Sequence, residues 1–245
     1  LTTDGGYIIA GGALSSDGDV TVNKGSFDYW IVKSDVSADL QWQKSLGGSG
    51  EEAAYSIQQT TEGGYIVAGY SYSNDGDVSE NHGGSDYWIV RLNTEGDTVW
   101  QKCLGGSADD VAYSIQQTSD GGFIVAGYSS SNDWDVTGNH GLSDYWIVKL
   151  DGDGNISWQK SLGGVNDDQG ASIQEISGGG FIVAGWSGVI GAADYWIINL
   201  DADGNIVWEK SYGGTGNDQA TSVRQTNDGG FIVAGHSYST DSNIT

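Results

Sequence analysis

The chain has 245 residues, a formal net charge of −24 at pH 7, 41 glycines, and neither proline nor methionine. Only nine residues are basic, so no patch of lysine and arginine remains to neutralise phosphates, and we expect neither nucleic acid nor an anionic membrane surface as a partner. The apolar runs, such as residues 181–185, have the length of a strand and fall far short of the roughly 20 residues that a membrane-spanning helix needs, so no membrane insertion is expected.

Two short phrases recur along the chain and define its repeats. Gly-Gly-(Tyr/Phe)-Ile-(Ile/Val)-Ala-Gly begins at five positions, namely Gly5, Gly63, Gly121, Gly179 and Gly229. Asp-Tyr-Trp-Ile begins at four positions, namely Asp28, Asp86, Asp144 and Asp194. Successive copies are 58 residues apart, except for the last interval of 50 in each set. A period of this size is typical of repeat architectures in which each unit packs on its neighbour, and the unbroken repeat predicts a single domain over residues 1–245.

Four short strands are predicted within one repeat, for which residues 111–164 serve as the example. Residues 112–118, 122–129, 144–150 and 156–160 are rich in Ile, Val, Tyr, Trp and Phe. The Asp-Gly and Asn-Gly pairs between them favour tight hairpins because these residues tolerate positive φ. Four antiparallel strands in each repeat predict an all-β fold, a β-propeller of four-stranded antiparallel blades. A solenoid is the alternative, but its coils are usually shorter, at about 20–30 residues.

Taken in order along the chain, the expected strands form a first repeat without its innermost strand, three complete repeats and a final pair of strands. Four blades would close if residues 221–226 supplied the missing innermost strand, which would leave residues 229–239 redundant. Five blades, two of them incomplete, is the arrangement that we favour. Because the chain begins inside a repeat, we expect it to be a module of a longer protein with flanking domains.

Paired acids with one residue between them occupy the loop after the second strand in three repeats: Asp17 and Asp19, Asp75 and Asp77, and Asp133 and Asp135. Such carboxylates can present several oxygens to Ca²⁺, which takes six to eight oxygen ligands. Solvated turn chemistry is the alternative interpretation. The corresponding loop of the fourth repeat, residues 187–193, is short and lacks acids. Ca²⁺ is the cofactor that these loops predict.

Two further sets of acids recur in every repeat and favour structural roles. Glu52, Asp110, Asp168 and Asp218 lie between the fourth strand of one repeat and the first strand of the next, where we expect them to cap backbone amides or bridge repeats. Asp28, Asp86, Asp144 and Asp194 are expected to make a structural bond at the start of the third strand. Residues 151–155 resemble a calcium loop, but their spacing favours a hairpin turn. His82 and His140 are replaced by Lys24 in the first repeat, which argues against histidine ligation of a metal.

The aromatic residues divide into periodic ones with structural roles and others that are candidates for ligand binding. Eight of the ten tryptophans are periodic, and we expect them to pack between repeats. The candidate ligand-binding residues are Trp134, which replaces a loop glycine, and four residues at the loop ends of the second strands: Tyr70, Tyr128, Trp186 and His236. Exposed rings beside acids and amides are suited to stacking on sugars, and local packing is the alternative.

Residues 144–164 resemble the secreted bacterial and archaeal β-propeller repeats of the SBBP type. An Asp-x-x-Gly-x-x-x-Trp pattern, present as Asp151, Gly154 and Trp158, is similar to the tryptophan repeats that dock the blades of quinoprotein propellers. The pattern returns as Asp201, Gly204 and Trp208. This resemblance implies a secreted or cell-surface protein, often a module of a longer polypeptide, and implies no particular activity.

Catalysis finds little support in the sequence, because no nucleophile elbow, phosphate loop, zinc spacing or dinucleotide fingerprint is present. The single cysteine, Cys103, stands where the other repeats have serine. We therefore expect a non-enzymatic extracellular binding or adhesion module whose acidic loop face engages Ca²⁺, a glycan or a protein. The alternatives are a structural spacer and a carbohydrate-active enzyme with a carboxylate pair.

Overall fold

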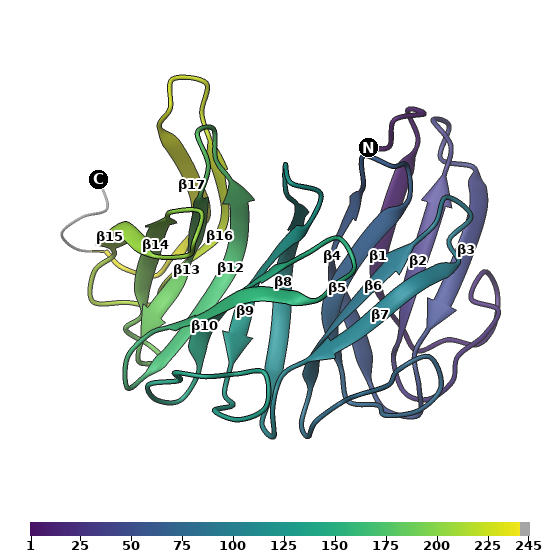
Figure 1. Ribbon diagram of the computed structural model, residues 1–245, viewed down its shortest axis with the longest axis horizontal. Helices are drawn as coiled ribbons and strands as arrows, with labels where there is room; N and C mark the ends of the chain where they lie inside the picture. Colours follow the sequence, from purple (N-terminus) through teal and green to yellow (C-terminus); the bar gives the residue numbers. More distant parts are fainter. Residues whose placement is uncertain (241–245) are drawn as a thin grey trace. The chain divides into compact units, whose positions relative to one another are not determined.

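The computed structural model describes residues 1–240, which form antiparallel strands and no helix, so no helix of this part could cross a membrane (Figure 1). Within the described residues the chain divides into two compact units, residues 1–117 with 133–135, and residues 118–132 with 136–240. The first unit contains β1 (Tyr7–Ala13), β2 (Asp28–Ser34), β3 (Leu40–Leu46), β4 (Glu52–Gln59), β5 (Tyr65–Ser71), β6 (Asp86–Leu92), β7 (Thr98–Leu104) and β8 (Asp110–Gln117). The second contains β9 (Phe123–Ser129), β10 (Asp144–Leu150), β11 (Ile156–Leu162), β12 (Asp167–Glu175), β13 (Phe181–Gly188), β14 (Asp194–Leu200), β15 (Ile206–Tyr212), β16 (Asp218–Gln225) and β17 (Phe231–Ser237).

The first unit contains a three-stranded sheet, β1-β2-β3, and a four-stranded sheet, β4-β5-β6-β7, each paired in sequence order. The strand β8 lies against β4 and β5. Apolar side chains from the facing sides of the two sheets form one core, which includes Tyr29, Ile31, Tyr65, Val67, Trp88, Val90 and Leu92. Every second residue of these strands enters the core, as the alternation of side chains along a strand requires.

The second unit repeats this arrangement. The strands β9, β10 and β11 pair in order, β12 to β15 form a four-stranded sheet, and β16 pairs with β17 alone. Its core joins Ile147, Phe181, Val183, Ile198 and Leu200 between the two larger sheets. The predicted all-β fold of repeated antiparallel sheets is thus confirmed.

The strands predicted from one repeat are found with small shifts at their ends. Residues 144–150 are a strand with the predicted bounds, and residues 112–118, 122–129 and 156–160 correspond to β8, β9 and β11. The strand β11 runs two residues further than predicted, and β8 begins two residues earlier, at Asp110.

Periodic aromatic residues hold neighbouring sheets together within each unit. The rings of Tyr29 and Trp88 lie 4.4 Å apart, and the Tyr29 hydroxyl donates to the Trp88 carbonyl oxygen at 2.9 Å. The same pair recurs in the second unit, where Tyr145 and Trp196 are 4.8 Å apart with a hydrogen bond of 2.9 Å. These contacts confirm the predicted packing role for Trp88 and Trp196, two of the four tryptophans in the third strands.

The Gly-Gly phrase is explained by two different demands on its two residues. Gly63 has a φ of 95°, a conformation that other residues rarely adopt, and its amide donates to the Thr60 carbonyl oxygen at 2.9 Å. At Gly64 a Cβ would lie 2.2 Å from the carbonyl oxygen of Leu92. The first glycine therefore closes the hairpin, and the second lets the neighbouring strand approach.

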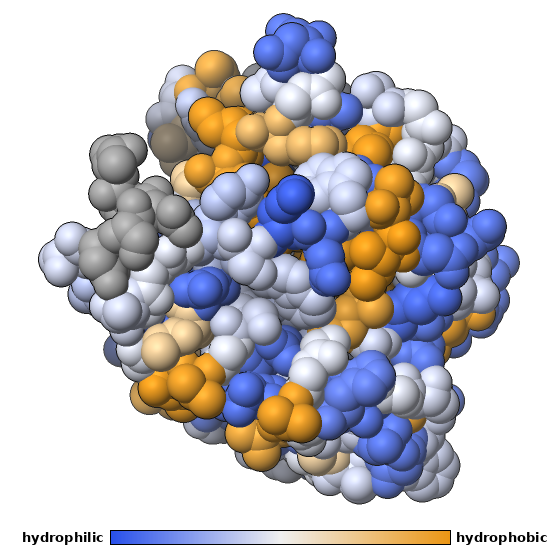
Figure 2. Space-filling view, turned by 90° about the vertical axis from the view of Figure 1, so that its left-hand side faces the viewer, coloured by the Kyte–Doolittle hydropathy of each residue, from blue (hydrophilic) through white to orange (hydrophobic). Residues whose placement is uncertain are grey.

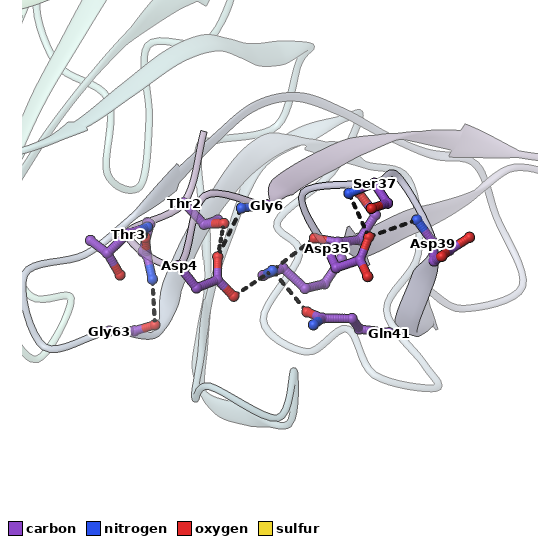
Figure 3. Close-up of polar contacts among 12 residues, drawn as sticks. Thr2, Thr3, Asp4, Gly6, Asp35, Ser37, Asp39, Gln41 and Gly63 are labelled. Carbon is purple, nitrogen blue, oxygen red and sulfur yellow. Dashed lines mark hydrogen bonds and ion pairs between the residues drawn. The ribbon is translucent and has the colours of Figure 1, made fainter.

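The turn between the third and fourth strands is closed by one acid or amide side chain. Figure 3 shows Asp35, whose Oδ1 accepts hydrogen bonds from the amides of Ser37 at 2.8 Å and Asp39 at 2.9 Å. Asp151 accepts from the amides of Asp153 at 3.0 Å and Asn155 at 2.8 Å in the same way. The predicted hairpin at residues 151–155 is confirmed.

Candidate binding surface

The paired acids of the second-repeat loop bind backbone amides of the preceding repeat. Asp75 Oδ1 accepts a hydrogen bond from the Ser49 amide at 2.7 Å, and Asp77 Oδ2 accepts one from the Gly47 amide at 3.1 Å. The hydrogen bonds from Ser49 lower the pKa of Asp75. Asp77 also forms an ion pair with Lys24. These carboxylates hold the loop against the turn that follows β3.

The third-repeat loop makes the same contacts with the turn that follows β7. Asp133 Oδ1 accepts from the Ser107 amide at 2.8 Å, and Asp135 Oδ2 accepts from the Gly105 amide at 3.3 Å. The hydrogen bonds from Ser107 lower the pKa of Asp133. Two loops thus use their acids as backbone acceptors.

The first-repeat loop is different, because both of its acids, Asp17 and Asp19, are exposed, whereas the second acid of each of the other two loops is half-buried. Its turn is closed by the Val20 amide, which donates to the Asp17 carbonyl oxygen at 3.2 Å. Within residues 1–240, no cluster of three or more His, Cys, Asp or Glu side chains has a geometry suited to a metal ion. Calcium binding by the six loop acids stays a prediction.

The acids that link successive repeats cap backbone amides, as predicted. Glu52 is buried, and its Oε2 accepts from the Gly48 amide at 2.8 Å, while its Oε1 accepts from the hydroxyls of Ser71 at 2.8 Å and Ser73 at 2.7 Å. The equivalent bonds are Gly106 to Asp110 at 2.7 Å, Gly164 to Asp168 at 2.7 Å and Gly214 to Asp218 at 2.9 Å. This cap is common to all four repeat junctions.

The aspartates at the start of the third strand bind the loop that precedes them. Asp86 is buried and accepts from the His82 amide and from His82 Nδ1, both at 2.9 Å. Burial raises the pKa of Asp86 to about 6, although the hydrogen bonds from His82 oppose this rise. His140 contacts Asp144 in the same way, at 2.7 Å from its Nδ1. The predicted structural bond is confirmed for these repeats, and both histidines contact carboxylates.

Four tyrosines of the first unit gather into one cluster that the sequence analysis found only in part. The ring of Tyr55 lies 5.2 Å from Tyr113 and 5.9 Å from Tyr70, and Tyr70 lies 5.7 Å from Tyr72 in an edge-on contact. Tyr55 is 53% exposed and Tyr72 is 49% exposed. We call these four residues the tyrosine cluster.

A β-bulge positions the central ring of this cluster. The pairing of β4 with β5 shifts register between Ala54 and Ser56, so that Tyr55 is the extra residue of the bulge. Such a residue is left outside the ladder and its side chain can be aimed away from the regular pleat. Tyr55 therefore presents its ring to solvent although it belongs to a strand that packs on β1 and β8.

Acidic side chains border the tyrosine cluster. The Tyr70 hydroxyl donates to Glu51 Oε1 at 2.6 Å, and burial together with this bond raises the pKa of Tyr70. Burial likewise raises the pKa of Tyr113 to about 12, and it raises that of Tyr72, whose hydroxyl also interacts with Ser85 and Asp109. The hydroxyls of Tyr70, Tyr72 and Tyr113 are therefore neutral near pH 7 and can donate hydrogen bonds, with the carboxylates of Glu51 and Asp109 nearby as acceptors.

The sequence contains one signal for this cluster. Tyr55 and Tyr113 occupy a repeat position that holds Ala171 and Thr221 in the later repeats, so a departure from the repeat marks the two residues. Tyr70 is the one member that the sequence analysis predicted.

Trp134, the second predicted residue in the first unit, lies on a loop away from any strand. It is 70% exposed, and its ring stacks 4.9 Å from that of His82. Its φ of 54° is one that the equivalent Gly18 and Gly76 adopt more easily.

The three remaining predicted residues belong to the second unit, and each has its own surroundings. Trp186 is a half-buried residue of β13, paired with Tyr195 of β14. Tyr128 is half-buried on β9 and pairs with Tyr145. His236 is exposed at the end of β17, and its ring lies 5.5 Å from that of Tyr238.

The chain resembles one known protein in sequence and another in fold. No family model matches it. A stretch of 137 residues is 28% identical to the "Regulatory protein FlaEY" of Caulobacter vibrioides, and the match covers 51% of this chain but only 14% of that protein. The crystal structure of a protein of unknown function from Bacteroides caccae is similar with a TM-score of 0.51 and 12% identity, over 94% of this chain and 65% of that one. The likeness to the Bacteroides caccae protein is one of fold alone. The chain thus spans less than two thirds of either protein.

Proposed function

We propose that the chain is a non-enzymatic extracellular binding module that stacks a neutral glycan on the tyrosine cluster. The observation that carries this proposal is the group of four contacting tyrosines, two of them about half exposed, with Tyr55 at a strand bulge. Sugar rings present C–H faces that pack on aromatic rings, and their hydroxyls need the donors and acceptors found at its border.

The charge of the chain favours a neutral glycan over an acidic one. The net charge of −24 and the carboxylates of Glu51 and Asp109 beside the cluster would repel uronic acids and sulfated sugars. A protein partner with exposed basic residues is the second candidate class for an acidic surface of this kind. The secreted or cell-surface location that we propose is supported by the resemblance of the repeats.

Five blades of a β-propeller, with the first and the last incomplete, are the fold that we propose for the repeated sheets. Four-stranded antiparallel sheets in sequence order, packed through periodic aromatic residues, support this arrangement. In such a fold the innermost strands β4 and β8 carry Tyr55 and Tyr113, which would place the tyrosine cluster near the axis.

Binding of the chain to a panel of neutral polysaccharides by affinity electrophoresis tests the proposed function. Tyr55→Ala is expected to weaken binding about tenfold or more, since one aromatic contact is worth on the order of 1.4 kcal/mol. Tyr7→Ala is the matched control, because Tyr7 is 41% exposed on β1 and belongs to no such cluster. Equal binding by both variants, or no binding to any member of the panel, would overturn the proposal in favour of a spacer.

Calcium at the exposed loop of Asp17 and Asp19 is a separate proposal. Both acids of this loop are exposed, whereas in the other two loops the second acid is half-buried and both acids accept hydrogen bonds from backbone amides. A thermal melt in millimolar calcium against one in EDTA tests it, because an ion that binds the folded state raises the midpoint. An unchanged midpoint would make this loop a solvated turn.

A further inference from the structure

The end of the second unit has an apolar hollow with a volume of about 680 Å³ beside β14, β15 and β17. The hollow is lined by Tyr195, Ile197, Trp208, Lys210, Tyr212, Phe231 and Val233. Apolar side chains reach the surface on the side of the molecule shown in Figure 2. The last sheet consists of β16 and β17 alone, so that no third strand covers the lining within the described residues.

In earlier repeats, the sheet face that corresponds to this hollow is covered by the next repeat. In the first unit, Trp88, Val90 and Leu92 of β6 are buried in the core that holds Tyr29, Ile31 and the partly buried Trp42. In the second unit, Ile198 and Leu200 of β14 fill the corresponding place. In both, the third strand of one repeat covers the face of the repeat before it.

The turn after the covering strand makes two additional contacts in the first unit. A Cβ at Gly96 would lie 2.9 Å from the Trp42 ring and 3.1 Å from Lys44 Cε, so the backbone of the turn rests on these two side chains. Beside it, Lys44 Nζ forms an ion pair with Asp97 at 2.7 Å.

The second unit repeats the contacts of this turn. A Cβ at Gly204 would lie 2.9 Å from the Trp158 ring and 3.1 Å from Lys160 Cε. The indole of Trp158 donates to the Ala202 carbonyl oxygen at 3.2 Å, and Lys160 Nζ lies 3.5 Å from Asn205 Oδ1. In both units, therefore, the glycine of the turn packs on the tryptophan and lysine, and the Asp or Asn that follows it contacts the lysine amine.

Trp208 and Lys210 are the corresponding tryptophan and lysine of the hollow. The Lys210 side chain is exposed, and no acid among residues 1–240 forms an ion pair with it. The ring of Trp208 contacts Phe231 at 5.7 Å, as Trp158 contacts Phe181 at 5.9 Å. The hollow thus has the tryptophan, phenylalanine and lysine that contact a hairpin elsewhere in the second unit, and within residues 1–240 the Lys210 amine has no ion-pair partner.

We propose that this hollow docks a β-hairpin of the internal-repeat type from a polypeptide segment outside residues 1–240. The hairpin carries Trp, Val or Ile, and Leu at alternate positions of its first strand, and Gly followed by Asp or Asn in its turn. Its tryptophan and aliphatic side chains fill the hollow, its glycine rests on Trp208, and its acid or amide binds Lys210. This inference does not depend on the glycan proposal.

The β2–β3 hairpin of a second copy fits this surface poorly. It has Ser34 in place of the leucine. In the turn it has Ala38, at a φ of 65°, where the internal repeats have the buried glycine. The Ala38 methyl group would meet the Trp208 ring, as a Cβ at Gly204 would meet that of Trp158. The occupant is therefore an internal-type repeat and not the first hairpin of the same chain.

Fluorescence anisotropy with labelled peptides tests the proposal on the intact chain. A peptide of residues 194–214 is expected to bind at least about tenfold more tightly than a peptide of residues 28–48, and a Gly204→Ala version is expected to bind like the latter. Lys210→Ala in the chain should weaken binding of the first peptide. Val207→Ser should not, because Val207 is 61% exposed and is not part of the lining of the hollow.

A second measurement covers the case in which a free peptide does not fold. Two fusion proteins are compared. In the first, residues 188–214 follow Ser237, as they follow the equivalent Ser187 in the chain. In the matched second fusion, residues 22–48 follow Ser237. The first fusion is expected to raise the melting midpoint by several degrees over the second. Equal midpoints, together with equal or absent peptide binding, would overturn the proposal. Self-association of the chain through this surface, unaffected by the peptide, would also overturn it and assign the hollow to a second copy.

Discussion

The long loop of the second repeat and the short loop of the fourth show which contacts the repeat requires. In the first unit, Asp75 from a long loop lies against Gly48, where a Cβ would be 2.4 Å from its Oδ1. In the second unit, the short loop brings nothing within 4 Å of a Cβ at the equivalent Gly164. The acid cap is present in both, since Gly48 donates to Glu52 and Gly164 to Asp168. The cap is therefore the common element, and the loop acids add to it.

The third-strand aspartates differ in the same way. Asp86 is fully buried and bound by His82 of its long loop, whereas Asp194 is only half-buried and follows the short loop. Burial raises the pKa of both, and repulsion from the Asp218 carboxylate contributes for Asp194. The strand begins at the aspartate in each repeat, so the long loop is not needed to form it.

The largest difference in stability between the two regions is expected when the second glycine after the fourth strand, Gly48 or Gly164, is replaced by alanine. Gly48→Ala forces the Asp75 loop away and should lower the free energy of unfolding by about 2–3 kcal/mol, the usual cost of overpacking. Gly164→Ala should change it by less than about 0.5 kcal/mol, because the site is open. Urea unfolding followed by tryptophan fluorescence measures both. Equal decreases in the free energy of unfolding would mean that the acid cap, which both sites share, determines the destabilisation, and not the loop acid.

Sequence reasoning reached the repeats and their hairpins because these depend on local chemistry. The strand at residues 144–150, the turn acid Asp151 and the amide caps follow from short phrases whose spacing is visible in the chain. The tyrosine cluster depends on contacts between strands about 60 residues apart and on the bulge at Tyr55. No local pattern states which residue becomes the bulge, so only Tyr70 was predicted.

A pH titration should give the next largest effect. The folded pKa of Asp86, about 6, exceeds its ordinary value of 3.8, so the folded state binds more protons between these pH values. The contribution of Asp86 to the free energy of unfolding should therefore rise by about 2 kcal/mol as pH falls from 7 to 4, at 1.36 kcal/mol for each unit of pKa shift. Asp86→Asn should remove the part that comes from Asp86, whereas Asp28, Asp144 and Asp194, whose pKa values burial also raises, keep their contributions.

Below pH 4 the trend should reverse, because other carboxyls have lowered pKa values. Although burial opposes it, hydrogen bonds from Thr118 and Lys149 lower the pKa of Asp120 to about 2, so its stabilising contribution is lost as pH falls through that range. The carboxyl carbon resonance of Asp86 reports its midpoint directly by NMR. A titration midpoint of Asp86 near pH 4 would show that its carboxyl is solvated. Asp86 and Asp194 would then not differ in burial as described above.

The smallest effect is expected at Trp134, where backbone strain and ring contact oppose each other. Trp134→Gly restores the residue type found at Gly18 and Gly76 and relieves roughly 1 kcal/mol of cost at positive φ. It also removes the stacking on His82, which is worth a similar amount, so the melting midpoint should move by no more than about two degrees. Because Trp134 is not part of the tyrosine cluster, glycan binding should change less than in Tyr55→Ala. A large loss of binding at an unchanged midpoint would move the proposed site to the loop, and the strain at Trp134 would then be tolerated for recognition rather than compensated by packing.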